Sequence, residues 1–209
     1  MTIPKKIIQI WLQGDIDKKY KENIMRLNPE YEYELFQEKN CINFLRTHYP
    51  PIIMNCFLNI IKPAHKSDFF RYCYLYKRGG IYIDIDLKPI YSFDKIIEDS
   101  ENSDFITALG SNSFNNMPFG ECTNGFLMTV PNNQLFKELV GFILKNINPR
   151  DYGIYVKHLY KSLNNPKPFQ QFTLNNLKCY LFKEVFIERP NFIINRRGYK
   201  IINSNGNGY

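Results

Sequence analysis

The sequence predicts an α/β fold with a mostly parallel central sheet flanked by helices. Segments with strand-like and helix-like periodicity alternate along the chain, which is the pattern of such folds. A chain of 209 residues with 44% hydrophobic content can also bury a sizeable core. We expect one domain over residues 1–202. Residues 203–209 are rich in Asn and Gly and resemble a flexible tail or a linker toward a further domain.

The start of the chain predicts a β-α-β unit. Residues 6–12 are apolar and β-branched, as in a buried strand, and Gly14-Asp15 follows as a turn or helix-start signal. After the breaker Asn28-Pro29, residues 31–36 alternate in polarity and predict a second strand.

Residues 66–78 predict a helix, because their apolar side chains recur at helical spacing. Ser67 is expected to cap its start and Gly79-Gly80 to end it. The period then changes, so that Tyr82, Asp84 and Asp86 should share one face of a strand.

The second half of the chain has weaker periodicity beyond residue 150. The expected elements are strands at 104–109, 125–130, 179–182 and 192–195, and helices at 135–146 and 152–163.

Charge and cysteine content limit the classes of function. A net charge of +7 favours an anionic partner, but the basic residues are scattered, so we expect a nucleotide-sized anion and no nucleic acid. The five cysteines are widely spaced, as in reduced cytosolic proteins without a zinc site. No apolar run approaches the ~20 residues of a membrane span. We predict a cytoplasmic location, or the host cytoplasm if the protein is viral.

Asp84 and Asp86 are the candidate metal ligands. Two carboxylates on one strand face need a cation, and hard oxygen ligands suit Mn²⁺ or Mg²⁺, which would bridge them to the diphosphate of a nucleotide sugar. From the triplet alone, two aspartates on an exposed strand face are an equal alternative. Asp68 and Arg71 share a helix face, where they could hold a ligand's hydroxyl groups or form an ordinary surface ion pair.

Residues 67–72 (SDFFRY), 75–76 (LY) and 79–86 (GGIYIDID) resemble the sugar-binding region of glycosyltransferase family 32. That family includes yeast α-mannosyltransferases and bacterial capsule-type transferases and is related to the clostridial glucosylating toxins. Residues 3–11 resemble its first strand and residues 28–33 its second. The small size is similar to transferases of large algal DNA viruses.

The resemblance implies a GT-A fold and a metal-dependent transfer of a hexose or deoxyhexose. The expected donor is a nucleotide sugar such as UDP-glucose, the acceptor is a glycan hydroxyl group, and the anomeric configuration is retained. Asp84, Asp86 and Arg71 are the implied catalytic residues, with Asp86 as the direct metal ligand. The implied substrate-binding residues are Gln9, Trp11 (stacked on the nucleobase), Leu12, Asp68 and Arg71 (on the donor sugar), Tyr82, Asn124 and Gly125.

The chain departs from the family pattern at two places. Ile8 occupies a position that is often His, and no late Gly-Pro element or C-terminal His or Ser-Trp is found beyond residue 150. The only late histidine, His158, fits a structural role on an amphipathic helix. The last metal ligand and the acceptor pocket therefore remain unassigned.

Two other classes of function compete. Phosphatases of the haloacid-dehalogenase type also carry an Asp-x-Asp motif and bind Mg²⁺, but there the motif ends an N-terminal strand. A non-catalytic module that binds nucleotide sugars or nucleic acid is allowed by the charge and the many aromatic residues.

Overall fold

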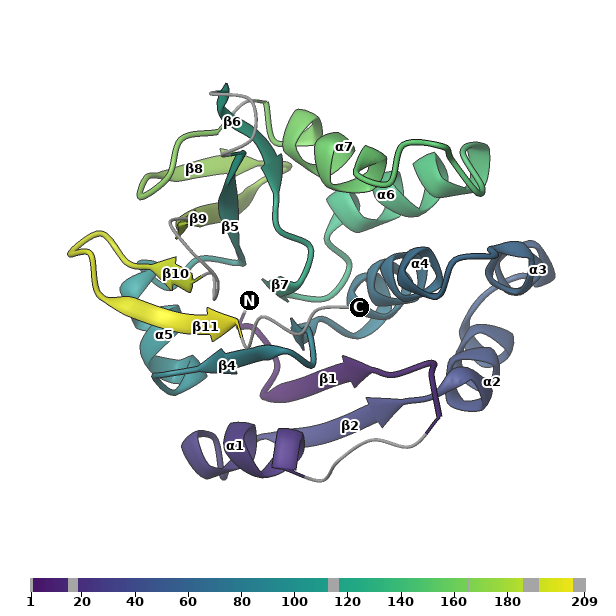
Figure 1. Cartoon of the computed structure of the whole chain (residues 1–209), viewed down its shortest axis with the longest axis horizontal. Coiled ribbons are helices and arrows are strands. Elements are labelled where there is room, and N and C mark those ends of the chain that lie inside the picture. Colours follow the sequence, from purple (N-terminus) through teal and green to yellow (C-terminus); the bar gives the residue numbers. More distant parts are fainter. Residues whose placement is uncertain (1, 15–18, 113–116, 165, 186–191, 205–209) are drawn as a thin grey trace.

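The computed structural model describes residues 2–14, 19–112, 117–164, 166–185 and 192–204. These residues form a mixed sheet covered by helices, which confirms the α/β class (Figure 1). Among them, no helix has the length and apolar character that would let it cross a bilayer.

The N-terminal unit is the predicted β-α-β arrangement. It consists of β1 (Lys6–Ile10), α1 (Lys19–Leu27) and β2 (Glu32–Phe36), and the two strands pair in parallel. β1 also pairs in parallel with β3 (Gly80–Ile83), so it lies between two neighbours and is almost wholly buried. The apolar run in the sequence follows from this position.

Three helices lead from β2 to β3, namely α2 (Glu38–His48), α3 (Pro51–Asn59) and α4 (Pro63–Arg78). The helix α4 begins before the predicted residue 66, because Pro63 occupies its first turn, where a missing N–H group costs nothing. Ser67 is therefore a buried residue inside the helix, and its predicted role as a cap is wrong.

Gly79 and Gly80 end α4 as predicted, and both have positive φ angles, of 63° and 101°. A Cβ atom would lie 2.6 Å from the backbone nitrogen of Pro131 at the first position and 2.7 Å from the backbone oxygen of Lys6 at the second. Only glycine fits this tight connection between helix and strand.

The strand after α4 is shorter than its alternating sequence predicts. β3 ends at Ile83, and the backbone N–H of Leu87 donates to the carbonyl oxygen of Asp84 at 3.0 Å, which closes a turn before β4 (Leu87–Pro89). The expectation that Asp84 and Asp86 share one face of a continuous strand is wrong. Asp84 follows directly after β3, whereas Asp86 lies in the turn.

Eleven strands of the described chain form one sheet in the order β2-β1-β3-β7-β5-β9-β10-β11-β4, with β6 added to β5 and β8 to β9. The pairs β1-β2, β1-β3 and β5-β9 are parallel, and the remaining pairings are antiparallel. The further strands are β5 (Phe105–Asn112), β6 (Met117–Cys122), β7 (Phe126–Thr129), β8 (Gln171–Leu174), β9 (Leu177–Val185), β10 (Phe192–Ile194) and β11 (Lys200–Ser204).

The remaining helices are α5 (Phe93–Asp99), α6 (Gln134–Lys145) and α7 (Ile154–Ser162). The last two confirm the helices predicted at 135–146 and 152–163. At the C-terminus, Asn203 and Ser204 pair with β4 and so differ from the expected tail, whereas residues 205–209 lie outside the described part.

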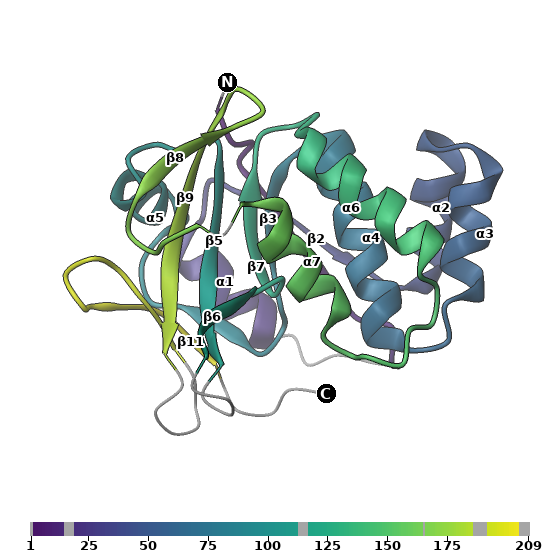
Figure 2. The ribbon, with the colours of Figure 1, turned by 90° about the horizontal axis from the view of Figure 1, so that it is seen from above.

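Two hydrophobic cores lie on opposite faces of the sheet. One packs beneath α2, α3, α4, α6 and α7, which gather on one side in Figure 2, and contains Phe70, Tyr74 and Phe136. The other lies beneath α1 and α5 and contains Phe93, Phe126 and Phe182. Most of the aromatic residues thus serve the interior. All five cysteines are buried and none forms a disulfide, as expected for reduced thiols.

Candidate active site

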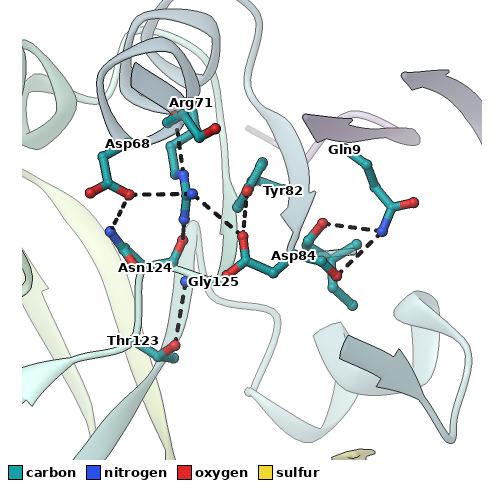
Figure 3. Close-up of polar contacts among 10 residues, drawn as sticks. Gln9, Asp68, Arg71, Tyr82, Asp84, Thr123, Asn124 and Gly125 are labelled. Atoms are coloured by element: carbon teal, nitrogen blue, oxygen red, sulfur yellow. Dashed lines mark hydrogen bonds and ion pairs between the residues drawn. The ribbon is translucent and has the colours of Figure 1, made fainter. Parts of the chain in front are cut away.

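The predicted site residues meet where β3 ends and β7 begins. These strands are antiparallel, with Ile83 opposite Phe126, so Asp84 and Gly125 face each other just beyond the paired residues. The backbone N–H of Asp84 donates to the carbonyl oxygen of Gly125 at 2.7 Å. The helix α4 passes beside this junction and contributes Asp68 and Arg71 (Figure 3).

Arg71 is the centre of the polar network. Its side chain is only 3% exposed, and its guanidinium group lies 3.2 Å from Asp68 and 3.4 Å from Asp84. It also donates to the backbone oxygens of Asn124 at 2.6 Å and Ser67 at 3.3 Å. Burial lowers the pKa of Arg71, but the adjacent Tyr82, Asp84 and Asp68 raise it by more, so the charge is retained.

Asp68 is a buried carboxylate held by two donors. Its Oδ1 atom accepts a hydrogen bond from Asn124 Nδ2 at 2.7 Å and faces Arg71. Burial raises the pKa of Asp68 to about 6, although Arg71 acts in the opposite direction. From the sequence, Asp68 and Arg71 could have formed an ordinary ion pair on the surface. In the structure their ion pair is buried.

Asp84 is fixed from three sides. The hydroxyl group of Tyr82 donates to its Oδ1 atom, and the Arg71 guanidinium that pairs with it lies 4.1 Å from the centroid of the Tyr82 ring. On the third side, a Cβ atom on Gly125 would lie 2.5 Å from Asp84 Oδ2. Glycine is therefore needed at position 125 to leave room for the carboxylate.

Gln9 is fully buried, and it holds the backbone on which Asp84 sits. Its amide nitrogen donates to the carbonyl oxygens of Ile83 and Asp84, both at 3.3 Å, while its Oε1 accepts from the Tyr33 hydroxyl group at 2.9 Å. These contacts engage both ends of the amide, so Gln9 positions the site from behind. The role of Gln9 in substrate binding, which the family resemblance implies, stays a prediction.

Trp11 and Leu12 lie just beyond the end of β1. The backbone N–H of Trp11 donates to Phe36 at 2.9 Å, which continues the β1-β2 pairing by one residue. Its side chain is half-buried, and that of Leu12 packs against the core beneath α4.

A third carboxylate, missed in the sequence, lies close enough to Asp84 and Asp86 for their charges to affect its pKa. Glu184 lies on β9, and its Oε2 atom would be 3.6 Å from a Cβ atom on Gly110 of β5. Burial raises the pKa of Glu184 to about 7, and the nearby Asp84, Glu121 and Asp86 raise it as well. The pKa of Asp86 is raised by burial and then by Asp84.

These acidic groups make the region negatively charged, but their side chains are not arranged as the ligands of a metal ion. Within the described residues, no group of three or more His, Cys, Asp or Glu side chains could hold a metal ion in its present arrangement. The local sequence around Glu184 carries no motif. The only sequence signal was the strand predicted at 179–182. If its two-residue period continues to residue 184, Glu184 lies on the same sheet face as residues 180 and 182.

One exposed aromatic residue lies beside this network. The Tyr152 side chain is 61% exposed and lies against the His65 ring, with ring centroids 5.2 Å apart and a tilt of 32°. Burial raises the pKa of Tyr152, and the negative charge of Asp68 raises it further. The Tyr152 hydroxyl group is thus affected by a charged residue of the site. His158 instead stacks on Phe142 with centroids 3.6 Å apart, in agreement with a structural role.

The fold is that of a GT-A-type glycosyltransferase. The chain superposes on the solved structure of PaToxG glycosyltransferase with a TM-score of 0.53 and 16% sequence identity, over 78% of this chain and 70% of that one. At this level of identity, the likeness establishes the fold alone.

The sequence comparisons define the group of relatives. Residues 14–103 match the family described as the glycosyltransferase sugar-binding region containing a DXD motif. The chain is 35% identical over 104 residues to the initiation-specific alpha-1,6-mannosyltransferase of Saccharomyces cerevisiae, covering 44% of this chain and 22% of the relative. It is 34% identical over 90 residues to an uncharacterized glycosyltransferase of Acanthamoeba polyphaga mimivirus, covering 41% and 36%.

The resemblance carried by residues 67–86 is thus confirmed, and the chain is a relative of the Asp-x-Asp glycosyltransferases. The aligned segments span about a fifth to a third of the length of these relatives.

Proposed function

We propose that the protein transfers a hexosyl group from a nucleotide-sugar donor to a hydroxyl group of a glycan, with the help of a divalent cation. The observation that carries this proposal is the buried network of Asp68, Arg71 and Asp84, built from the segments that match the Asp-x-Asp transferases. The names of several relatives include mannosyl transfer, which supports a hexose as the transferred group.

Asp68 is the proposed contact for the donor sugar. Both of its described partners, Asn124 Nδ2 and the Arg71 guanidinium, lie on Oδ1. The Oδ2 atom is therefore left to accept a hydrogen bond from a sugar hydroxyl group. Such a charge-assisted bond at a buried site is strong and depends on direction, which suits the selection of one sugar.

The carboxylates of Asp86 and Glu184 are the proposed direct ligands of Mn²⁺ or Mg²⁺. Asp84 Oδ1 is already occupied by Arg71 and Tyr82, so its remaining oxygen is the one that could reach the ion or a bound water. The donor set fits a hard cation because it consists of carboxylate oxygens. The raised pKa values of Asp86 and Glu184 reflect burial and the nearby negative charge of Asp84, both of which a cation would offset.

When bound, the ion would neutralise charge that develops on the departing nucleoside diphosphate. In the proposed reaction, Arg71 holds Asp84 and Asp68 in place, and Trp11 orients the nucleotide by stacking on its base. We assign no general base, because in a transfer with retention the departing phosphate oxygen can accept the proton of the acceptor hydroxyl group. Uridine is our expected base for the donor.

Tyr152 is the proposed platform for the acceptor. Its ring is exposed and its pKa is raised in part by Asp68, and its tilted contact with the His65 ring limits its freedom before any ligand binds. A preordered aromatic face costs little entropy when a sugar ring packs against it.

The competing classes are less well supported. A dehalogenase-type phosphatase needs its Asp-x-Asp at the end of the first strand, whereas here β1 ends at Ile10 and the motif follows β3. A non-catalytic module would bind the donor without consuming it, so turnover separates the two.

The test is calorimetric titration with UDP-glucose and GDP-mannose, with and without Mn²⁺, together with release of nucleoside diphosphate. Asp86→Asn should abolish metal-dependent binding and lower turnover roughly 100-fold or more. Glu22→Gln on the exposed surface of α1 is the matched control and should behave as wild type. Full activity of Asp86→Asn would refute the metal assignment, and binding without turnover would favour the non-catalytic module.

A further inference from the structure

A pocket lies away from the carboxylates of the candidate active site, between α5, the first part of β9 and the turn that joins β10 to β11. These elements are neighbours in Figure 1. The pocket has a volume of about 390 Å³, which lies within the ~300–1,000 Å³ range of small-molecule sites. Its lining includes three tyrosines and two arginines, namely Tyr91, Tyr180, Tyr199, Arg196 and Arg197.

The turn that forms one wall is held rigidly against α5. Asn195 Oδ1 accepts from the backbone N–H groups of Arg197 and Tyr199, both at 3.1 Å, which shapes the turn. Asn195 Nδ2 donates to Asp99 at 3.0 Å, and Asp99 also pairs with Lys95 at 3.1 Å. The side chains that extend from the turn are therefore attached to an ordered backbone, as a binding site requires.

The aromatic rings of the pocket differ in exposure. Tyr199 is 58% exposed and Tyr91 is 38% exposed, so both offer ring faces to a ligand, whereas Tyr180 forms the buried floor. The pKa of Tyr180 is raised by burial and then by Glu101, while Arg196 lowers it. Charged groups of both signs therefore line the same pocket as Tyr180.

The pocket is lined by charged groups of both signs, and only some of them form ion pairs. Across the described residues, Arg196, Arg197 and Glu101 make no ion pair, whereas Asp99 is neutralised by Lys95. The uncompensated groups are two positive and one negative, so a ligand that carries a charge of either sign meets at least one group of the same sign. A polyhydroxyl ligand suits this lining, because each hydroxyl group can both donate to a carboxylate and accept from a guanidinium.

We propose that this pocket is a second saccharide-binding site, which takes a neutral glycan by stacking on the tyrosines and by hydrogen bonds to Arg196, Arg197 and Glu101. It is separate from the donor site. Tyr180 and Glu184 are on the same strand, about 13 Å apart at the ~3.3 Å rise per residue of a β-strand, and the buried Phe182 lies between them.

The experiment is titration of the protein with maltotriose and α-1,6-linked mannotriose, followed by calorimetry and by saturation-transfer NMR. Tyr199→Ala and Arg197→Ala change exposed side chains, so the fold should survive, which circular dichroism checks. We expect each to weaken trisaccharide binding at least tenfold while the affinity for UDP-glucose stays unchanged. Arg46→Ala, an exposed arginine on α2, is the matched control.

Three results would overturn this inference. They are trisaccharide affinities that are the same in the variants as in the wild type, no trisaccharide binding by the folded protein at the solubility limit, and binding of inorganic phosphate in place of saccharides. The test of the proposed transferase function is independent of the test of this second site. If UDP-glucose and GDP-mannose neither bind nor turn over but trisaccharide binding still depends on Tyr199 and Arg197, the second site stands without it.

Discussion

The guanidinium group of Arg71 lies 3.4 Å from Oδ1 of Asp84, and this ion pair joins the middle of α4 to the residue that follows β3. Arg71 also pairs with Asp68 at 3.2 Å, so one buried cation balances two carboxylates from different elements. A buried charge without its partner is far more costly than an exposed one, and for this reason the network couples the stability of the fold to the geometry of the site.

We predict that Arg71→Met destabilises the protein by about 3–5 kcal/mol, the usual cost of removing one partner from a buried ion pair. The reason is that Asp68 and Asp84 would be left facing each other without a cation. Urea unfolding followed by circular dichroism measures the change. Arg46→Met on the exposed face of α2 is the control and should stay within about 0.5 kcal/mol of wild type. Equal stability of the two variants would contradict the prediction.

Gly125→Ala should impair the site while the fold persists. An added Cβ atom would lie 2.5 Å from Asp84 Oδ2, so the carboxylate must move away from its place between Tyr82 and Arg71. We expect donor turnover to fall more than tenfold, because small displacements at a catalytic centre carry large penalties.

Gly141→Ala is the matched control, because a Cβ atom there meets nothing within 4 Å and the residue lies in α6. That variant should be as active as wild type and slightly more stable. The prediction fails if Gly125→Ala retains full turnover.

The parts of the fold that the sequence predicted are those with a strong local period. Residues 6–12 form an apolar run because β1 is buried between two strands. Residues 66–78 have apolar side chains at helical spacing, and α4 is buried without interruption from Ser67 to Leu75. The break after Ile83 was not predictable in this way. Ile85 is buried in the turn, so the apolar alternation continues although the strand does not.

The site was predictable only as far as the local motif reaches. Asp68, Arg71 and Asp84 lie within one continuous segment, and the structure brings them together. Glu184 comes from β9, and its approach depends on the parallel pairing of β5 with β9, which no local pattern reveals. The close fit of Gly125 to Asp84 likewise follows from the register of β3 and β7.

The buried carboxyl group of Asp68 should make stability depend on pH. Its pKa is raised to about 6 in the fold, above the ~3.9 of an unfolded chain, so its contribution to stability is full below about pH 4 and is lost as the pH rises through 6. Asp68→Asn cannot titrate. As the pH rises from 4 to 7.5, the unfolding free energy of Asp68→Asn should therefore increase by about 2–3 kcal/mol relative to that of the wild type.

Urea unfolding of both proteins at four pH values in that range measures this shift. A change at Glu22, an exposed acidic residue in the first turn of α1, serves as the reference, since Glu22→Gln should give a curve parallel to wild type. Parallel curves for Asp68→Asn as well would show that the carboxyl group ionises normally in the fold.

Trp11 provides a test of the donor orientation. It is half-buried directly after β1, beside Leu12, whose side chain packs against the core. If Trp11 stacks on the nucleobase, Trp11→Ala should weaken UDP or GDP binding by about 1–3 kcal/mol, and Trp11→Phe should restore much of the loss, because a smaller ring can still stack. Leu144→Ala on α6, a partly buried side chain that packs against the same core, should lower stability and leave nucleotide affinity unchanged. Calorimetric titration and urea unfolding of all three variants separate these effects. Unaltered nucleotide affinity in Trp11→Ala, together with a clear loss of stability, would show that the indole belongs to the core.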